Sequence, residues 1–431
     1  MDSIQVEKSP LLSGDVHISG SKNAALPIMA GAILFDSPLR LDNIPDLADI
    51  QGMERLLCSM GMETCYHPEQ RSLDIDPTRI RWPEAPYDLV RKMRASFFVL
   101  GPLIGRHRRA RVSMPGGCAI GARPVNIHLK SLECLGVNIT VEHGYVIADA
   151  SQMRGGLVNL EFPSVGATEN VICAAVLARG ETCIENAARE PEVADLADFL
   201  IAGGACIEGH GTSTIRIQGV ERLRTEAYSV IPDRIEAGTY LAAGALCGGA
   251  IRVCGCRARD LTAFLADLRL TGCEISVESD GNLDNIILKR SSPIQPVTEI
   301  VTLPYPGFPT DLQAQMMAVL CLAEGTSIVR ETIFENRFMH VSELNRMGAD
   351  ISINGNTAIV RGVRHLSGSP VMASDLRASA ALVISGLVAQ GTTEVLRVYH
   401  LDRGYERIEE KLAGLGARIS RVKIHPSSTV R

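Results

Sequence analysis

The chain has 431 residues, of which 46% are hydrophobic and 4% aromatic, so it can build two or three domains around a large aliphatic core. Its net charge of −6 disfavours nucleic acid as a partner. No apolar run approaches the roughly 18 residues that a membrane-spanning helix needs, and we therefore expect a cytoplasmic protein without membrane insertion. Its twelve cysteines are scattered through apolar segments, as buried reduced thiols are.

The first twenty residues mix charged and apolar side chains in alternation, which predicts strand rather than a signal peptide. After them, six segments share one plan. Each has an Ala-rich apolar helix, a Gly-punctuated strand, a polar-faced helix and a short strand. The apolar helices are predicted to begin near Asn23, Arg94, Ala167, Ile235, Leu312 and Arg377.

A glycine follows the polar-faced helix in every repeat, where a helix commonly ends on a residue with positive φ. These glycines recur at intervals of 68 to 76 residues. They are Gly61, Gly136, Gly204, Gly272, Gly348 and Gly416.

The apolar helices should be buried because they are hydrophobic nearly all round, whereas the polar-faced helices carry a single apolar stripe. Buried helices with sheets outside them make an inside-out α/β fold. Six units of about 70 residues exceed one core, so we expect two domains, each a pseudo-threefold of the repeat. A solenoid scaffold without chemistry is the alternative, but its polar capping repeats are missing.

Charged residues recur at two places in the repeats. Helix N-termini attract anions, and an added cation makes a phosphate or carboxylate site. At or near the starts of apolar helices lie Lys22, Asn23, Arg94, Asp311 and Arg377. Beside Gly-rich or aromatic turns near the polar-faced helices lie Arg123, Arg337 and Arg403. This recurrence predicts a shared polyanion site.

Cys118 lies in the segment MPGGCAIGARP, with three glycines and Arg123 nearby. The glycines allow close approach, and the arginine favours the thiolate. We therefore expect a reactive thiol rather than a buried filler. Cys254 and Cys256 lack a second ligand pair for zinc. The chain also lacks P-loop, zinc-protease and serine-hydrolase motifs. We expect no metal and no cofactor.

Ten motifs spread over the whole chain resemble those of the UDP-N-acetylglucosamine 1-carboxyvinyltransferases, a family of enolpyruvyl transferases. The motifs are SGSKNAALPI, MRAS, GGCAIGARPV, SVGATEN, ENAAREPE, PDRIEAGT, FPTDLQAQ, FENRFMH, DLRASAAL and DRGYERIEEKL. The related shikimate-pathway enolpyruvyl transferases lack the GGC segment. The resemblance implies transfer of the enolpyruvyl group of phosphoenolpyruvate to the 3-hydroxyl of UDP-N-acetylglucosamine, the first committed step of peptidoglycan synthesis.

The resemblance also implies the enolpyruvyl transferase fold. One inside-out α/β domain would comprise residues 22–232 and carry the Cys118 segment. The other would comprise residues 1–21 and 233–431, and the substrates would bind in the cleft between them. We expect a monomer that the epoxide fosfomycin inhibits by a covalent bond to Cys118.

The site residues that the resemblance implies fall into three groups. The expected catalytic residues are Cys118 as proton donor, Asp311 as base, and Lys22 and Arg403. The expected contacts of phosphoenolpyruvate are Lys22, Asn23, Arg123, Arg337, Arg377 and Arg403. The expected contacts of UDP-N-acetylglucosamine are Asn23, Arg94, Arg123, Pro124, Val125, Asn126, Ile127, Ser164, Val165, Gly166, Asp311 and Ile333.

Two positions depart from the family pattern: Asn126 stands where aspartate is common, and Phe162 where some members have lysine. Two alternative functions remain. One is the shikimate-pathway enolpyruvyl transfer. The other is a catalytically silent sensor of UDP-sugars, against which the presence of Cys118, Asp311 and Arg403 argues.

Overall fold

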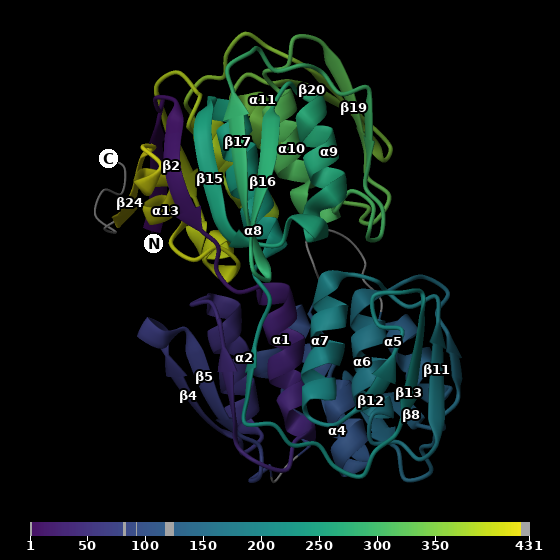
Figure 1. The fold of residues 1–431 in the computed structure, drawn as a ribbon. Coiled ribbons are helices and arrows are strands. Elements are labelled where there is room, and N and C mark those ends of the chain that lie inside the picture. The colour runs from purple at the N-terminus through teal and green to yellow at the C-terminus, as the bar shows by residue number, and fades with distance from the viewer. Residues whose placement is uncertain (1, 81–82, 92, 117–124, 424–431) are drawn as a thin grey trace, which may run out of the picture. The chain divides into compact units, whose positions relative to one another are not determined.

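The computed structural model describes residues 2–80, 83–91, 93–116 and 125–423, which form two compact units (Figure 1). Unit 1 contains residues 2–19 and 232–423, and unit 2 contains residues 20–116 and 125–231. The chain therefore passes between the units after Ser19 and again after Ile231. The domain boundaries expected from the sequence, residues 22–232 and residues 1–21 with 233–431, stay a prediction.

Unit 2 contains three four-stranded sheets of the same topology. In each sheet the first two strands are parallel and the remaining neighbours antiparallel. The strand orders are β14(Ala227–Ser229)–β3(Leu39–Asp42)–β5(Ser72–Asp76)–β4(Glu63–His67), β6(Glu84–Ala85)–β7(Arg109–Ser113)–β9(Tyr145–Asp149)–β8(Asn138–Glu142), and β10(Leu157–Asn159)–β11(Glu181–Glu185)–β13(Thr214–Gln218)–β12(Cys206–Glu208).

Unit 1 repeats this topology in three further sheets, with the same parallel pair and the same antiparallel neighbours. The strand orders are β2(Leu12–His17)–β15(Gly249–Cys256)–β17(Leu283–Arg290)–β16(Glu274–Asp280), β18(Glu299–Val301)–β19(Thr326–Arg330)–β21(Thr357–Arg361)–β20(Asp350–Asn354), and β22(Pro370–Met372)–β23(Thr392–Leu396)–β1(Asp2–Glu7)–β24(Arg418–Lys423). The strands predicted for the N-terminus are therefore confirmed, and Figure 1 shows β2 beside β15.

The helices predicted to be buried form the centre of each unit, with almost every side chain shielded from solvent. In unit 2 they are α1(Lys22–Gly31), α4(Leu100–His107) and α6(Val165–Ala175). In unit 1 they are α8(Arg234–Cys247), α10(Gln313–Leu320) and α12(Leu376–Gly386). The hydrophobic core of each unit contains these helices, the inward faces of its own three sheets and the buried stripes of its polar-faced helices. The inside-out α/β fold with pseudo-threefold repeats is therefore confirmed.

Each polar-faced helix buries its apolar stripe and exposes its polar face. They are α2(Ala48–Ser59), α5(Asn126–Glu133), α7(Pro191–Ala202), α9(Thr262–Leu270), α11(Val341–Arg346) and α13(Ile408–Gly414). All six closing glycines have positive φ, between 80° and 102°, so their predicted helix-ending role is confirmed. Shorter helices are α3(Tyr87–Val90) and the 3₁₀ turns η1(Ala32–Leu34), η2(Pro68–Gln70), η3(Arg94–Val99), η4(Ala258–Leu261), η5(Thr310–Leu312) and η6(Val398–Arg403).

One predicted helix is wrong at its start. The segment from Arg94 begins as 3₁₀ helix η3, and the α-helix starts only at Leu100. The amide of Gly101 donates to the Asn170 side chain at 2.6 Å, and Pro102 has no N–H to donate. Two successive α-helical hydrogen bonds are thereby lost, which favours the tighter turn.

The cysteine prediction is only partly right. Cys254 and Cys256 are buried as expected, but Cys58, Cys65, Cys134 and Cys206 are exposed. All eleven cysteines in the described ranges are free thiols. Within the same ranges, no helix is long and apolar enough to cross a bilayer.

Candidate functional site

The carboxylate of Asp311 contacts two buried arginines in unit 1. Its Oδ1 accepts from Nη2 of Arg337 at 2.8 Å, and its Oδ2 accepts from Nη2 of Arg377 at 2.9 Å. The Arg337 and Arg377 side chains are only 5% and 4% exposed, whereas that of Asp311 is 26% exposed. Two guanidinium groups against one carboxylate leave an excess of positive charge, as a site for an anion requires.

The repeat architecture explains why these residues meet. Asp311 lies in η5, directly before α10, and Arg377 is the second residue of α12. The N-cap Asp375 accepts from the amides of Arg377 and Ala378 at 2.9 and 3.1 Å, which fixes the first turn of α12. The turn before one buried helix and the first turn of its neighbour thus carry the carboxylate and the guanidinium of one ion pair.

Electrostatics hold Arg377 in its charged form. Burial alone lowers the pKa of its guanidinium, but the nearby carboxylate of Asp311, followed by Tyr405 and Asp233, outweighs burial and raises the pKa above the ordinary value. His340 lies close to this group and is fully buried. Burial lowers the pKa of His340 to about 4. The charge of Asp375 favours protonation, and the charge of Arg337 opposes it. His340 is therefore a neutral imidazole at physiological pH.

The buried carboxylate of Glu331 organises the loop that carries Ile333. Its Oε1 accepts from the amides of Ile333 and Phe334 at 2.8 and 3.1 Å. Its Oε2 accepts from the hydroxyl of Thr310 at 2.9 Å, so Glu331 connects this loop to the residue before Asp311. Arg403, at the end of η6, is half-buried in the same unit.

Lys22 forms a buried ion pair in unit 2. Its Nζ lies 2.8 Å from Oδ2 of Asp49, and the two side chains are 10% and 7% exposed. Lys22 is the first residue of α1, whose N-cap Ser21 accepts from the Ala24 amide. Asp49 lies in the first turn of α2. The cation is therefore held rigidly at a helix N-terminus, where the helix dipole adds to its charge.

Asn170 brings together three segments of unit 2. Its Oδ1 accepts from the Gly101 amide, and its Nδ2 lies 3.0 Å from Nδ1 of His128 in α5 and 3.1 Å from the carbonyl of Gly166. A Cβ at Gly166 would lie 2.8 Å from Cε1 of His128, so the close approach of α5 and α6 requires glycine there. Ser164 caps α6 by accepting from Ala167.

These contacts place two predicted stretches near each other, residues 125–127 at the start of α5 and residues 164–166 at the start of α6. In unit 1 the structure likewise brings Asp311, Arg337 and Arg377 into contact. Asn23 and Arg94 are half-buried at the starts of α1 and η3. The predictions for Cys118, Arg123 and Pro124 lie outside the described residues.

Several residues of these networks were missed by the sequence reasoning. Tyr405 and Asn170 lie inside the motifs DRGYERIEEKL and SVGATEN, but buried tyrosine and asparagine side chains are common in protein cores, so the sequence alone does not mark them as site residues. Asp49 and Glu331 carry no local signal, since their partners are remote in sequence. The missed residues are Asp49, Asn170, Glu331, His340 and Tyr405.

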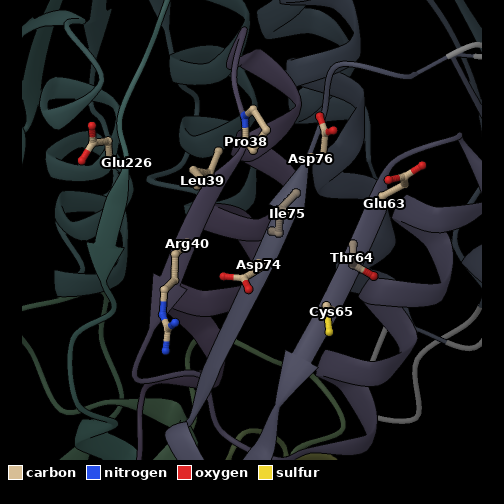
Figure 2. Close-up of a pocket in the computed structure, with 10 residues that line it drawn as sticks. All are labelled: Pro38, Leu39, Arg40, Glu63, Thr64, Cys65, Asp74, Ile75, Asp76 and Glu226. Carbon is tan, nitrogen blue, oxygen red and sulfur yellow. The ribbon is translucent and has the colours of Figure 1, made fainter.

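A separate hollow of about 490 Å³ lies against the sheet β14–β3–β5–β4 of unit 2. Figure 2 shows Arg40 and the acids Asp74, Asp76 and Glu63 around it, and Glu226 also lines it. The predicted site residues do not line this hollow. Four carboxylates against one guanidinium make it unsuited to an anion. In the part of the chain that the structure describes, no cluster of His, Cys, Asp or Glu could hold a metal ion.

Comparison with protein families gives a match over residues 6–412 to the family described as EPSP synthase (3-phosphoshikimate 1-carboxyvinyltransferase). Curated proteins named UDP-N-acetylglucosamine 1-carboxyvinyltransferase match over almost their whole length. The protein of Nitratidesulfovibrio vulgaris (strain DP4) is 54% identical over 98% of this chain and 99% of its own. That of Anaeromyxobacter sp. (strain K) is 54% identical over 98% and 100%, and that of Geobacter metallireducens is 53% identical with the same coverage.

Solved structures of enolpyruvyl transferases share the fold. The enolpyruvyl transferase NikO from Streptomyces tendae matches with a TM-score of 0.86 and 25% identity over 97% of this chain and 98% of its own. EPSP synthase from Acinetobacter baumannii matches with a TM-score of 0.76 and 15% identity over 98% and 100%. At that identity the second likeness concerns the fold alone.

Proposed function

Because this chain belongs to the UDP-N-acetylglucosamine 1-carboxyvinyltransferase family, we propose that it transfers the enolpyruvyl group of phosphoenolpyruvate to the 3-hydroxyl of UDP-N-acetylglucosamine and releases phosphate. The observation that carries this proposal is 54% identity over 98% of the chain to proteins of that name. The reaction would be the first committed step of peptidoglycan synthesis, on which cell shape and division depend. Both substrates are intracellular metabolites, which supports action in the cytoplasm, and we expect a monomer.

The arginines of unit 1 suit the anionic groups of phosphoenolpyruvate. Arg337 and Arg377 present planar guanidinium groups that match phosphate and carboxylate oxygens, and Arg403 adds a third cation. An anion that binds these arginines competes with Asp311 for their hydrogens. Binding would therefore free the Asp311 carboxylate from its two partners and make it a stronger base when the substrate is present.

Unit 2 supplies groups that suit the nucleotide sugar and the phosphate. Lys22 and Asn23 stand at the N-terminus of α1, and Ser164–Gly166 at that of α6. Helix N-termini bind phosphate oxygens through free N–H groups. We propose that Arg94, residues 123–127, residues 164–166 and Ile333 contact UDP-N-acetylglucosamine, and that Lys22, Asn23 and Arg123 assist with phosphoenolpyruvate.

The proposed chemistry needs an acid and a base. Asp311 takes the proton of the sugar 3-hydroxyl while the oxygen of that hydroxyl bonds to carbon 2 of phosphoenolpyruvate. Cys118 donates a proton to carbon 3. Loss of a proton from carbon 3 and departure of phosphate from carbon 2 then restore the double bond. General acid–base catalysis of this kind typically contributes about 10²–10⁴-fold per group.

The acceptor distinguishes this proposal from the shikimate-pathway reaction. Purified protein should release phosphate from phosphoenolpyruvate when UDP-N-acetylglucosamine is added. Equal or faster phosphate release with shikimate 3-phosphate would show that UDP-N-acetylglucosamine is not the specific acceptor.

The role of Cys118 predicts covalent inhibition. Fosfomycin carries a phosphonate like the phosphate of phosphoenolpyruvate, so the cations should deliver its epoxide to the thiolate. Mass spectrometry should find one adduct per chain, on the peptide that contains Cys118. Cys118→Asp should keep measurable turnover and resist the inhibitor, because a carboxyl group still donates a proton but lacks the nucleophilic sulfur. An adduct on one of the exposed cysteines instead, such as Cys58, would refute the assignment.

A further inference from the structure

The hydroxyl group of Tyr405 lies at the meeting point of the three buried helices of unit 1. Nη1 of Arg377 in α12 donates to it at 3.3 Å, and Nε2 of Gln315 in α10 donates to it at 3.1 Å. Oγ1 of Thr239 in α8 lies 2.9 Å away. The Tyr405 side chain is fully buried, with only 2% of the residue exposed. One phenol therefore joins three helices that come from three different repeats.

The direction of every hydrogen bond in this network follows from counting donors. The Thr239 hydroxyl donates to the carbonyl of Ile235 at 2.8 Å, so it has no second hydrogen to give. Its oxygen accepts from Gln315 at 3.1 Å and must also accept from Tyr405. The phenol oxygen accepts from Arg377 and Gln315, and its only hydrogen goes to Thr239. With the Gln315 amide nitrogen facing both hydroxyls, these contacts require a neutral phenol, and Oε1 of Gln315 is left buried without a hydrogen-bond partner among the described residues.

The neutral phenol agrees with its surroundings. Burial raises the pKa of Tyr405, and this outweighs the opposing effect of the Arg377 charge. A neutral acceptor can hold a guanidinium without neutralising its charge. Arg377 thus keeps its positive charge available for Asp311 or for a bound anion.

Arg377 is fixed at two points. Its Nη2 bonds to Asp311 and its Nη1 to the phenol, while its guanidinium carbon lies 5.5 Å from the centre of the Tyr405 ring. If a bound anion displaces the Asp311 contact, the phenol is the one hydrogen-bond partner of the guanidinium that remains among the described residues. We propose that Tyr405 is a positioning residue, which orients Arg377 for the anionic substrate and does not itself touch the reacting atoms.

This inference rests on the proposed function, so the wild-type protein is assayed first with phosphoenolpyruvate and UDP-N-acetylglucosamine. Absence of turnover there would contradict the proposed function, whatever Tyr405 does. Tyr405→Phe keeps the ring beside Arg377 and removes only the hydroxyl. With a charge-assisted hydrogen bond lost, kcat/KM for phosphoenolpyruvate should fall about 10-fold, while KM for the nucleotide sugar changes by less than about 2-fold.

The matched control is Tyr240→Phe. Tyr240 is a fully buried tyrosine of α8 in the same unit, and its hydroxyl makes no hydrogen bond to any residue in the described ranges. This variant should keep kcat/KM within about 2-fold of wild type. Equal losses in the two variants would mean that any change to the core lowers activity, and the positioning role would be refuted.

A double-mutant cycle tests whether Tyr405 acts through Arg377. In an Arg377→Lys background, Tyr405→Phe should lower kcat/KM by less than about 2-fold, because the planar guanidinium that it orients is gone. The same 10-fold loss in both backgrounds would indicate a purely structural effect and overturn the proposal. Should Tyr405→Phe fold poorly, Thr239→Val removes the acceptor of the phenol hydrogen instead. It should lower kcat/KM about 3-fold, and unchanged kinetics in that variant would likewise refute the proposal.

Discussion

The two units have the same topology but hold their buried helices together with different chemistry. In unit 2, the neutral amide of Asn170 joins α4, α5 and α6 through the Gly101 amide, the His128 ring and the Gly166 carbonyl. In unit 1, the phenol of Tyr405 joins α8, α10 and α12 and also fixes a charged arginine. The repeat thus conserves architecture while the residues at the helix starts decide the chemistry. Under the proposed function, unit 1 would supply most contacts to phosphoenolpyruvate, and unit 2 most contacts to the nucleotide sugar.

The largest expected effect is that of Asp311→Asn in unit 1. The amide cannot take the hydroxyl proton, so kcat should fall about 10²–10⁴-fold, with the Kd of UDP-N-acetylglucosamine changed far less. Steady-state kinetics and calorimetric titration of the nucleotide measure both. The control Asp350→Asn removes an exposed carboxylate that pairs with Arg361 at 3.3 Å, and it should leave kcat within about 2-fold. An active Asp311→Asn variant would contradict the catalytic assignment of unit 1.

The second expected effect is that of Asn170→Ala in unit 2. The change removes the acceptor of the Gly101 amide and one contact of the His128 ring, which should cost roughly 1–3 kcal/mol of local stability. The starts of α5 and α6 should loosen, so KM for the nucleotide sugar should rise more than kcat falls. Hydrogen exchange of peptides from these helices checks the first expectation. The exposed residue Asn138 provides the control Asn138→Ala, and equal exchange in the two variants would argue against the role of Asn170.

The architecture could be predicted from the sequence because helix burial and helix ends depend on local patterns. The apolar Ala-rich segments and the recurring glycines, such as Gly61 and Gly416, are visible without knowledge of any long-range contact. The 3₁₀ start at Arg94 could not be predicted, since it depends on a side chain 69 residues away from Gly101.

The candidate site was predictable in its residue types but not in its pairings. Arginine and lysine at helix starts indicate an anion site, yet nothing local shows that one carboxylate, Asp311, would contact both Arg337 and Arg377. The pairing of Lys22 with Asp49 likewise depends on how α1 and α2 pack. Which side chains pair is a property of the tertiary fold, whereas residue types are properties of the sequence.

The units should also respond to acid in different ways. His340 in unit 1 has a pKa lowered from 6.5 to about 4, first by burial. The unfolded chain therefore binds a proton at a higher pH than the folded one, and stability is lost as pH falls from about 6.5 to 4. His340→Gln should reduce this loss, measured by hydrogen exchange of α11 and α12 at pH 7 and pH 5. The control His17→Gln changes an exposed histidine. If both variants lose protection at pH 5 as the wild type does, the acid sensitivity does not come from His340.

Glu169 in unit 2 should give the smallest effect and one of opposite sign. Both of its carboxylate oxygens are buried without a hydrogen-bond partner among the described residues. Burial, followed by the charges of Glu192 and Glu190, raises its pKa well above the ordinary value. Its contribution to stability is thus present at acidic pH and is lost as pH rises through the folded pKa. Hydrogen exchange of α6 should show that Glu169→Gln removes the loss of stability between pH 5 and pH 8. The exposed control Glu185→Gln should keep this loss. An unchanged pH dependence in Glu169→Gln would refute the role of Glu169.

The most direct test of the central claim is the identity of the reaction product. Purified protein is incubated with phosphoenolpyruvate and UDP-N-acetylglucosamine, and the nucleotide is analysed by mass spectrometry and NMR while phosphate is measured. We predict a nucleotide sugar that carries one enolpyruvyl group on the 3-oxygen, formed in equal amount to the phosphate. Asp350→Asn should form it at about the wild-type rate, and Asp311→Asn about 10²–10⁴-fold more slowly. Recovery of unmodified UDP-N-acetylglucosamine, or transfer to shikimate 3-phosphate instead, would contradict the account.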